Sequence, residues 1–385
     1  MSRQKDSRLT RALEHDFGSP AAIAIGVVAG LSWSLYADGA YQHFTNGSWH
    51  VRFLEAAHLN STRASVTSGL MTIFFFAVGL ELSREIHIGN LRRLRHSVPP
   101  IFGAIGGMVA TALASLLVGT FTHTSALRHG WGVPMATDIA FTLGVLALVG
   151  GRVPATLRLF LLTLAIADDV LSVVILSVTG VTHVRVAGLV ALGTVIIVVR
   201  LLARRHPSNA WRITVLIATW LCLVWANVEP PLAGVLAAMV VPFDSTSSVA
   251  LERRVSRWST GLVLPLFALV SCGLNWSSIS LRGDGATIIL SMIGVRTIGK
   301  MIGITSGVAL ARALGFRLHS SITWSMLGAA SLLCAIGFTV PLLFAGSLFA
   351  TTGQTYGAFT IGLLAASFIA SILGGLWMWT VARPH

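Results

Sequence analysis

Two adjacent aspartates are the residues of this chain with the clearest potential for chemistry. Asp168 and Asp169 lie in the stretch AIADDVLSVVIL, residues 165–176, which is otherwise almost wholly apolar. An ionised carboxylate at the centre of a membrane helix costs about 2.5–3.5 kcal/mol on insertion scales, so such residues are rare and face a cavity or a charged partner. Carboxylate oxygens are also the ligands that hard cations prefer, which suits Na⁺ as it suits Ca²⁺ and Mg²⁺.

Two carboxylates in one buried cavity can take up either a cation or protons. Neighbouring residues on a helix project about 100° apart, so the two carboxyl groups point to different sides of a cavity and do not hydrogen-bond to each other. Burial favours the protonated form of a carboxyl group, and two nearby carboxyl groups titrate as a coupled pair. An ion and a proton therefore compete for one site, which is the minimal requirement of an exchanger.

The composition indicates that these aspartates lie in a membrane. Of the 385 residues, 54% are hydrophobic and 11% are charged, whereas soluble domains carry roughly 25% charged residues. Apolar stretches long enough to cross a bilayer as helices recur along the whole sequence, and they are too uniform for a barrel. We predict an all-α polytopic membrane protein with about twelve spans, near residues 20–37, 65–82, 99–121, 131–150, 156–179, 186–203, 209–227, 230–243, 258–275, 286–311, 322–350 and 358–381.

The distribution of charge predicts the orientation. With a cytoplasmic N-terminus, twenty Lys and Arg residues fall on the inner side, five on the outer side and two inside a span. This bias places both termini in the cytoplasm. No nucleic-acid-binding motif accompanies the net charge of +13, so nucleic acid is not an expected partner. We expect one transporter domain over 1–385, with a cytoplasmic tail at 1–19 and an outer loop at 38–64, where Asn46-Gly47 favours a hairpin.

Five ionisable residues lie deep within the predicted spans. Charges at this depth are candidates for a functional site, because they face a cavity or pair with one another. Five of them together favour a functional site over a set of structural ion pairs. They are Asp138, Asp168, Asp169, Arg296 and Lys300.

Two predicted spans have the composition of helices that are interrupted at mid-membrane. WGVPMATDIAFTLGV places Pro134 close to Asp138, and LLCAIGFTVPLLFAG carries Gly337 and Pro341 at its centre. One interrupted span in each half predicts inverted repeats that cross at mid-membrane, with the binding site where the breaks meet. Each break exposes helix ends, positive at the N-terminal and negative at the C-terminal ends, which Asp138 and Lys300 could neutralise.

Eight segments resemble, in order, those of the bacterial NhaA-type Na⁺/H⁺ antiporters, and they extend over nearly the whole chain. They are FFFAVGLELSREI, GAIGGM, PMATDIAFTLGVLALVGGRVP, LRLFLLTLAIADDV, LAGV, LVLPLFALVSCG, GKMIGI and CAIGFTV. The ATDIAF and ADD segments, together with GK and IGFT, are the specific ones. The resemblance implies twelve helices, a homodimer in the bacterial inner membrane, and electrogenic exchange of two entering protons for one leaving Na⁺ or Li⁺, without a cofactor.

The resemblance also implies roles for residues of this chain. Asp168 and Asp169 would carry the ion and the protons, with Na⁺ bound at the pair and Lys300 as the partner of Asp168. Asp138 and Thr137 would belong to the crossing of the broken helices. Three further acids would belong to the cytoplasmic funnel and the response to pH: Glu81, Glu85 and Glu252.

The chain departs from the family pattern at several positions. Ser68 stands where the family commonly has an aspartate, and Arg296 is an extra cation one turn before Lys300 on the same helix face. A guanidinium that pointed at the aspartates would occupy one of them permanently, because arginine does not release its proton. We expect instead that Arg296 compensates Asp138 or the carbonyl ends of the broken helices, while Lys300 faces Asp168.

Other functions have to be weighed against exchange. A Na⁺-coupled solute symporter of related fold needs a roomier polar cavity, and the adjacent acids favour proton exchange over it. An inactive regulatory relative is compatible with Ser68 and Arg296. An intramembrane aspartyl protease also brings together aspartates from two helices, but its Gly-x-Gly-Asp signature is absent. We therefore expect a transporter for Na⁺ and pH homeostasis and not an enzyme, with Na⁺, H⁺ and membrane lipid as partners.

Overall fold

The computed structural model describes residues 18–49, 59–89, 91, 94–150, 152–179, 184–202, 208–244, 246–280 and 282–382. Throughout these ranges the regular secondary structure is helical. Seven of the described helices are long and apolar enough to cross a membrane, and five shorter apolar helices accompany them. The prediction of an all-α polytopic membrane protein is confirmed, while the number of spans stays a prediction.

Two compact units make up the chain, and each draws on both halves of the sequence. The first comprises Met1–Ile25, Arg95–Asp168 and Ser277–His385, and the second comprises Gly26–Leu94 and Asp169–Trp276. Helix α2 (Gly18–Tyr36) is divided between them. The boundary also runs between the two adjacent aspartates.

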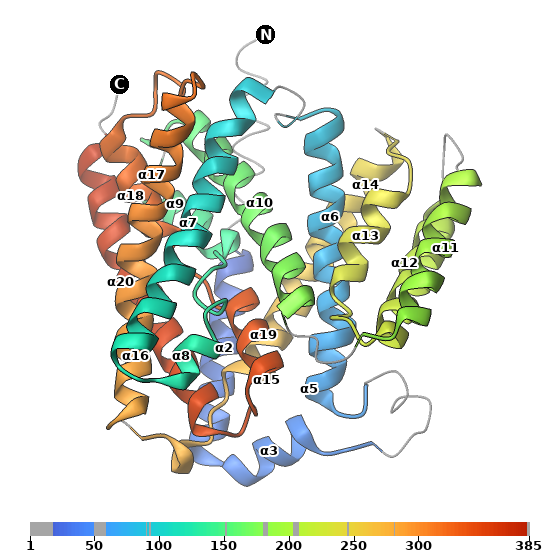
Figure 1. The fold of residues 1–385 in the computed structure, drawn as a ribbon, viewed down its shortest axis with the longest axis horizontal. Helices are drawn as coiled ribbons and strands as arrows, with labels where there is room; N and C mark the ends of the chain where they lie inside the picture. Colours follow the sequence, from blue (N-terminus) through green and yellow to red (C-terminus); the bar gives the residue numbers. More distant parts are fainter. Residues whose placement is uncertain are drawn as a thin grey trace. The chain divides into compact units, whose positions relative to one another are not determined.

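The first unit contains the interrupted helices and the helices around them. α20 packs against α16 and α18, and α17 packs against α18 (Figure 1). The helices of this unit are α7 (Leu94–Phe121), α8 (Ser125–His129), α9 (Ile139–Val149), α10 (Ala155–Thr179) as far as Asp168, α16 (Asp284–Gly294), the π-helical turn η5 (Val295–Gly299), α17 (Lys300–Ala313), α18 (Trp324–Leu333), α19 (Thr339–Leu348) and α20 (Gln354–Val381).

Both predicted interruptions are present in the first unit. Of the predicted span 131–150, only α9 is helical, and residues 135–138 before it have no regular secondary structure. The predicted span 322–350 is divided into α18 and α19 by residues 334–338. The two breaks contact each other, because the backbone N–H of Asp138 donates to the carbonyl of Ile336 at 2.8 Å. A bilayer tolerates irregular backbone only where the protein satisfies its polar groups, and this bond does so.

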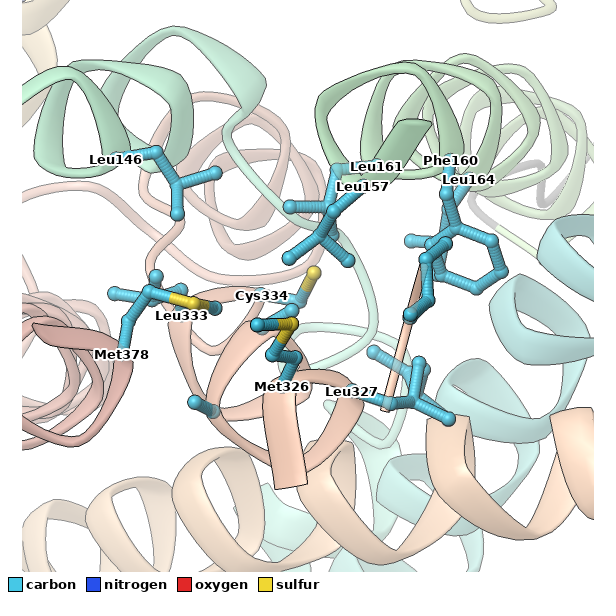
Figure 2. Packing of buried hydrophobic residues seen from close by; sticks show 14 of the residues in the cluster. Leu146, Leu157, Phe160, Leu161, Leu164, Met326, Leu327, Leu333, Cys334 and Met378 are labelled. Atoms are coloured by element: carbon cyan, nitrogen blue, oxygen red, sulfur yellow. The ribbon is translucent and has the colours of Figure 1, made fainter. Parts of the chain in front are cut away.

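A row of leucines on α10 anchors the helix in the core of the first unit. Leu157, Leu161 and Leu164 are buried and belong to one cluster with Met326 of α18 (Figure 2). Their spacing of four and three residues places them on one helical face. Asp168 lies eleven residues after Leu157, which is three helical turns, so it continues the same face. The apolar row therefore determines where the first aspartate points.

Glycines bring α7 and α17 into backbone contact. A Cβ atom at Gly106 would overlap the carbonyl oxygen of Gly303, and one at Gly303 would overlap that of Gly106. Gly307 likewise faces the backbone of Phe102. We call Gly106, Gly303 and Gly307 the glycine seam. Small residues of this kind allow close helix packing in membranes, where no hydrophobic force drives helices together. The seam fixes the position of α17, which carries Lys300 at its start.

The second unit is built around α6. This helix packs against α13 and α14, and α12 contacts both α11 and α13 (Figure 1). One predicted span of this unit began too late in the sequence: α14, η3 and α15 form one helical stretch over Ser247–Cys272, not 258–275. The elements are α3 (Asp38–Asn46), α5 (Thr62–Ala64), the π-helical turn η1 (Ser65–Leu70), α6 (Met71–His87), α11 (Val186–Leu201), α12 (Asn209–Ala226), α13 (Leu232–Val240), α14 (Ser247–Trp258), the π-helical turn η3 (Ser259–Val263) and α15 (Leu264–Cys272).

The hairpin predicted around Asn46-Gly47 is wrong in its first arm. Residues 41–44 belong to helix α3, and Gly47 has a φ of −57° instead of the positive value of a tight hairpin turn. The side chain of Tyr41 explains the difference, since it is buried and its hydroxyl donates to the carbonyls of Leu269 and Val270 at 2.9 Å. The second arm lies mostly outside the described residues.

Candidate functional site

Asp168 and Lys300 form a buried ion pair. Lys300 Nζ lies 2.9 Å from Asp168 Oδ2 and 3.1 Å from Oδ1, and both side chains are fully buried. The predicted pairing is therefore present. A buried pair is held together by both charges: removing one partner leaves an uncompensated charge and costs about 3–5 kcal/mol. Any cation that approaches Asp168 must replace the ammonium or share the carboxylate with it.

Arg296 lies one turn before Lys300 but binds different groups. Its Nε donates to the carbonyl of Ala335 at 3.0 Å, its Nη1 to that of Pro134 at 3.0 Å and its Nη2 to that of Ala136 at 2.9 Å. The side chain has no exposed surface. The guanidinium thus bonds carbonyls of both breaks and makes no hydrogen bond to Asp168. Both predicted partners are present: the guanidinium hydrogen-bonds the carbonyl ends, and its charge also attracts the carboxylate of Asp138.

Asp138 occupies the opposite, positive ends of the broken helices. It is the N-cap of α9, and its Oδ1 accepts from the backbone N–H of Ala140 at 3.2 Å. Its Oδ2 accepts at 3.2 Å from the hydroxyl of Thr339, the first residue of α19. Since helix N-termini are positive, one carboxylate stabilises both half-helices. The sequence had also suggested Lys300 for the negative ends, and this is wrong, because Arg296 has that position.

Thr137 and Gly337 complete the crossing of the two breaks. The Thr137 hydroxyl donates to the carbonyl of Cys334 at 2.8 Å. A Cβ at Gly337 would overlap Nη2 of Arg296 and would lie 2.7 Å from the carbonyl oxygen of Ala136. Only glycine allows the two backbones and the guanidinium to approach this closely. The crossing is therefore built from a carboxylate, a guanidinium, a hydroxyl and a glycine.

Asp169 follows Asp168 on α10 and is also buried, with 4% of its surface exposed. Because α10 is a regular helix here, the two side chains project about 100° apart. Among the described residues, no group of three or more His, Cys, Asp or Glu side chains could hold a metal ion. The binding of Na⁺ at this pair stays a prediction.

The three acids predicted for the funnel meet at one arginine in the second unit. Arg84 Nε lies 3.1 Å from Glu252 Oε2, and its Nη2 lies 3.5 Å from Glu85 and 3.6 Å from Glu81. From the sequence, Arg84 was expected only as one of the twenty basic residues on the inner side. Its spacing in GLELSREI, between two glutamates on one helix, was the signal that could have identified it. The cluster joins α6 to α14.

Comparison with known proteins agrees with the architecture. The model of the family described as Na⁺/H⁺ antiporter 1 matches residues 10–378. "Na(+)/H(+) antiporter NhaA 1" of Erythrobacter litoralis is 35% identical over 343 residues, which cover 87% of this chain and 84% of that protein. "Na(+)/H(+) antiporter NhaA" of Photorhabdus laumondii is 32% identical over 367 residues, which cover 93% of each chain.

The family match spans residues 10–378, a range that contains the broken helices and the aspartate pair, and both relatives align over most of the chain. The resemblance inferred from the sequence motifs is therefore confirmed. The chain is a multi-pass membrane protein that belongs to the NhaA family of Na⁺/H⁺ antiporters.

Proposed function

We propose that the protein extrudes cytoplasmic Na⁺ or Li⁺ in exchange for external H⁺, with two protons entering for each Na⁺. The observation that carries the proposal is the buried Asp168–Lys300 pair beside Asp169. We place Na⁺ at Asp168 and Asp169. We place both termini in the cytoplasm from the bias of basic residues. We infer a homodimer in the inner membrane, and a role in Na⁺ and pH homeostasis, from the family to which the chain belongs.

Two groups of the site can exchange a proton when the ion binds. In the ion-free site, Asp169 carries a proton and the ammonium of Lys300 neutralises Asp168. Binding of Na⁺ to both carboxylates displaces the proton of Asp169 and frees the ammonium, and a desolvated ammonium can release its proton. The site then has gained one Na⁺ and released two protons, one from Asp169 and one from Lys300. The proton-loaded and Na⁺-loaded forms differ by one charge, so the cycle is electrogenic.

Arg296 supports this scheme by the partners that it has. Its three carbonyl bonds leave the aspartate pair to Lys300, Na⁺ and protons. The main reason to consider an inactive relative was a guanidinium that blocks the acids, and these contacts weaken it. A Na⁺-coupled symporter stays the alternative, and the cheapest discriminating observation is Na⁺-driven proton movement without any organic solute.

Glu81, Glu85 and Glu252 would act at the cytoplasmic end of the pathway. Their cluster around Arg84 holds several titratable groups within one set of ion pairs. Protonation of these acids would weaken the link between α6 and α14. We propose that the cluster contributes to the response to pH, beside the direct competition at the aspartates.

The first prediction concerns Asp169. Changing Asp169→Asn removes the charge at nearly constant volume, and we expect Na⁺-induced proton release from inside-out vesicles to disappear. Asp284→Asn, at the start of α16 and exposed, is the matched control and should transport at the wild-type rate. Retention of exchange in the Asp169 variant would sink the assignment of the site.

The second prediction concerns pH. At low pH the carboxyl groups of the site bind protons and cannot hold Na⁺, and raising the pH frees them. The transport rate at fixed Na⁺ should therefore rise from mildly acidic to alkaline pH, measured in proteoliposomes with equal pH on both sides. A rate that does not change over this range would contradict competition at a shared site.

The third prediction separates the two protons. An inside-negative potential contributes about 2.3 kcal/mol per charge per 100 mV, so clamping it with valinomycin and K⁺ should accelerate Na⁺ extrusion by the wild type. In Lys300→Arg the guanidinium keeps its proton, and any remaining exchange should be one-for-one and indifferent to the potential. A flat response of the wild type, or a voltage-sensitive variant, would contradict the scheme.

The fourth prediction concerns Arg296. Changing Arg296→Met leaves three buried carbonyls without their donor, at about 1–3 kcal/mol for each unsatisfied group. We expect a clearly lower midpoint of thermal unfolding in detergent, with the two-proton stoichiometry unchanged in the activity that survives. Arg128→Gln, an exposed arginine of α8, is the control. A changed stoichiometry at unchanged stability would show that Arg296 belongs to the transport site.

A further inference from the structure

A cleft lies where α17 ends, well away in sequence from the aspartates. Its volume is about 690 Å³, and its lining comes from the segment between Arg312 and Trp324. All of these residues belong to the first unit. The transmembrane stretch Asp284–Ala313 ends within this segment. Because this stretch is long and apolar enough to cross a membrane, we place the cleft at its membrane-surface end. The transport scheme does not use it.

The lining of the cleft is basic and contains no carboxylate. Arg312, Arg317 and His319 contribute to it, and all three are exposed. From Gly285 to the last residue the sequence contains no aspartate or glutamate. The first unit's described acids are Asp138, Asp168 and Asp284, and none of them lines the cleft. No acidic side chain among the residues that line the cleft neutralises its positive charge.

The neutral polar groups of the cleft are hydrogen-bond donors. His319 Nδ1 accepts from the backbone N–H of Ser321 at 3.3 Å, so the ring proton of the neutral imidazole is on Nε2, which can donate outward. The α18 helix begins at Trp324 in the wall of the cleft, with Thr323 as its N-cap. A helix N-terminus of this kind adds backbone N–H donors and a positive partial charge. Every one of these features favours an anion.

Tryptophan rings contact two arginines of the first unit. The guanidinium of Arg312 lies 5.7 Å from the ring centre of Trp324, and that of Arg152 lies 5.5 Å from the ring centre of Trp379. Tryptophan is enriched at the depth of the headgroups. Trp377 donates from Nε1 to Ser325 Oγ at 3.3 Å and so links the end of α20 to the start of α18. Of these residues, Arg312 and Trp324 line the cleft, and the bond from Trp377 fixes the residue that follows Trp324.

We propose that this cleft binds the phosphate group of an anionic phospholipid. A phosphate offers three or more acceptor oxygens to two guanidiniums, an imidazole N–H and a helix N-terminus. Basic pockets beside transmembrane helices are suited to such headgroups. Inorganic phosphate shares this chemistry, but the position at the end of a membrane-spanning helix favours the lipid. The site is independent of the exchange of Na⁺ and H⁺.

The experiment titrates the purified full-length protein in detergent with dioleoylphosphatidylglycerol or dioleoylphosphatidylcholine and follows thermal unfolding. We expect the anionic phosphatidylglycerol to raise the midpoint of thermal unfolding more than the zwitterionic phosphatidylcholine does. In Arg312→Gln/Arg317→Gln its apparent affinity should fall by about fivefold for each arginine, the usual contribution of a basic residue near an anionic membrane. Arg254→Gln/Arg257→Gln, two exposed arginines of α14, removes the same charge elsewhere and should keep the wild-type affinity.

Three outcomes decide the proposal. Equal stabilisation by both lipids, or an equal loss in both double variants, would overturn it, because the effect would then be general attraction to a basic protein. Stabilisation by millimolar inorganic phosphate alone, lost only in Arg312→Gln/Arg317→Gln, would support the site and assign it to a soluble phosphate. Competition of inorganic phosphate against the glycerol lipid would show that both reach the same cleft.

Discussion

The hydrogen bonds of Arg296 to three backbone carbonyls are the interaction on which the rest of the site depends. Two helices that stop in the middle of a bilayer leave carbonyl and N–H groups that water cannot reach, and each unsatisfied group costs several kcal/mol. Arg296 binds carbonyls of both breaks, and Asp138 binds the N-terminal ends. Because a guanidinium has five N–H donors in a fixed plane, one side chain can bond three carbonyls that a lysine ammonium could not span.

This arrangement separates structural from functional charges. Asp138 and Arg296 are both committed to helix ends and together carry no net charge, so the crossing keeps its electrostatics whatever the site binds. Lys300 is thereby released from the helix ends, and its partner is Asp168. The charges that change during the proposed cycle are then confined to Asp168, Asp169 and Lys300.

The sequence predicted the parts of the fold that rest on simple physical rules. Adjacent aspartates, deep cations and two interruptions stand out because lipid makes each of them costly. Three features were missed, each for a different physical reason. Tyr41 stabilises a helix where Asn46-Gly47 suggested a turn, since its hydroxyl meets carbonyls more than two hundred residues away. The predicted span began too late because the first part of α14 contains charged residues, which an apolar span does not have. Its arginines are exposed, while Glu252 is buried. The position of Arg84 between two glutamates is visible in the sequence, but its ion pair with Glu252 exists only because α6 packs against α14.

The glycine seam has a mechanical consequence for how Lys300 can move. With backbone in contact with backbone, α17 cannot slide or roll against α7 without driving carbonyl oxygens into main-chain atoms. The two helices therefore behave as one stiff rod, and Lys300 stands at a fixed point on it. For Lys300 to part from Asp168, either its own side-chain torsions or helix α10, which carries Asp168, has to move relative to this rod. Collective helix motions take microseconds to milliseconds, so any displacement of α17 carries α7 with it on that slow time scale.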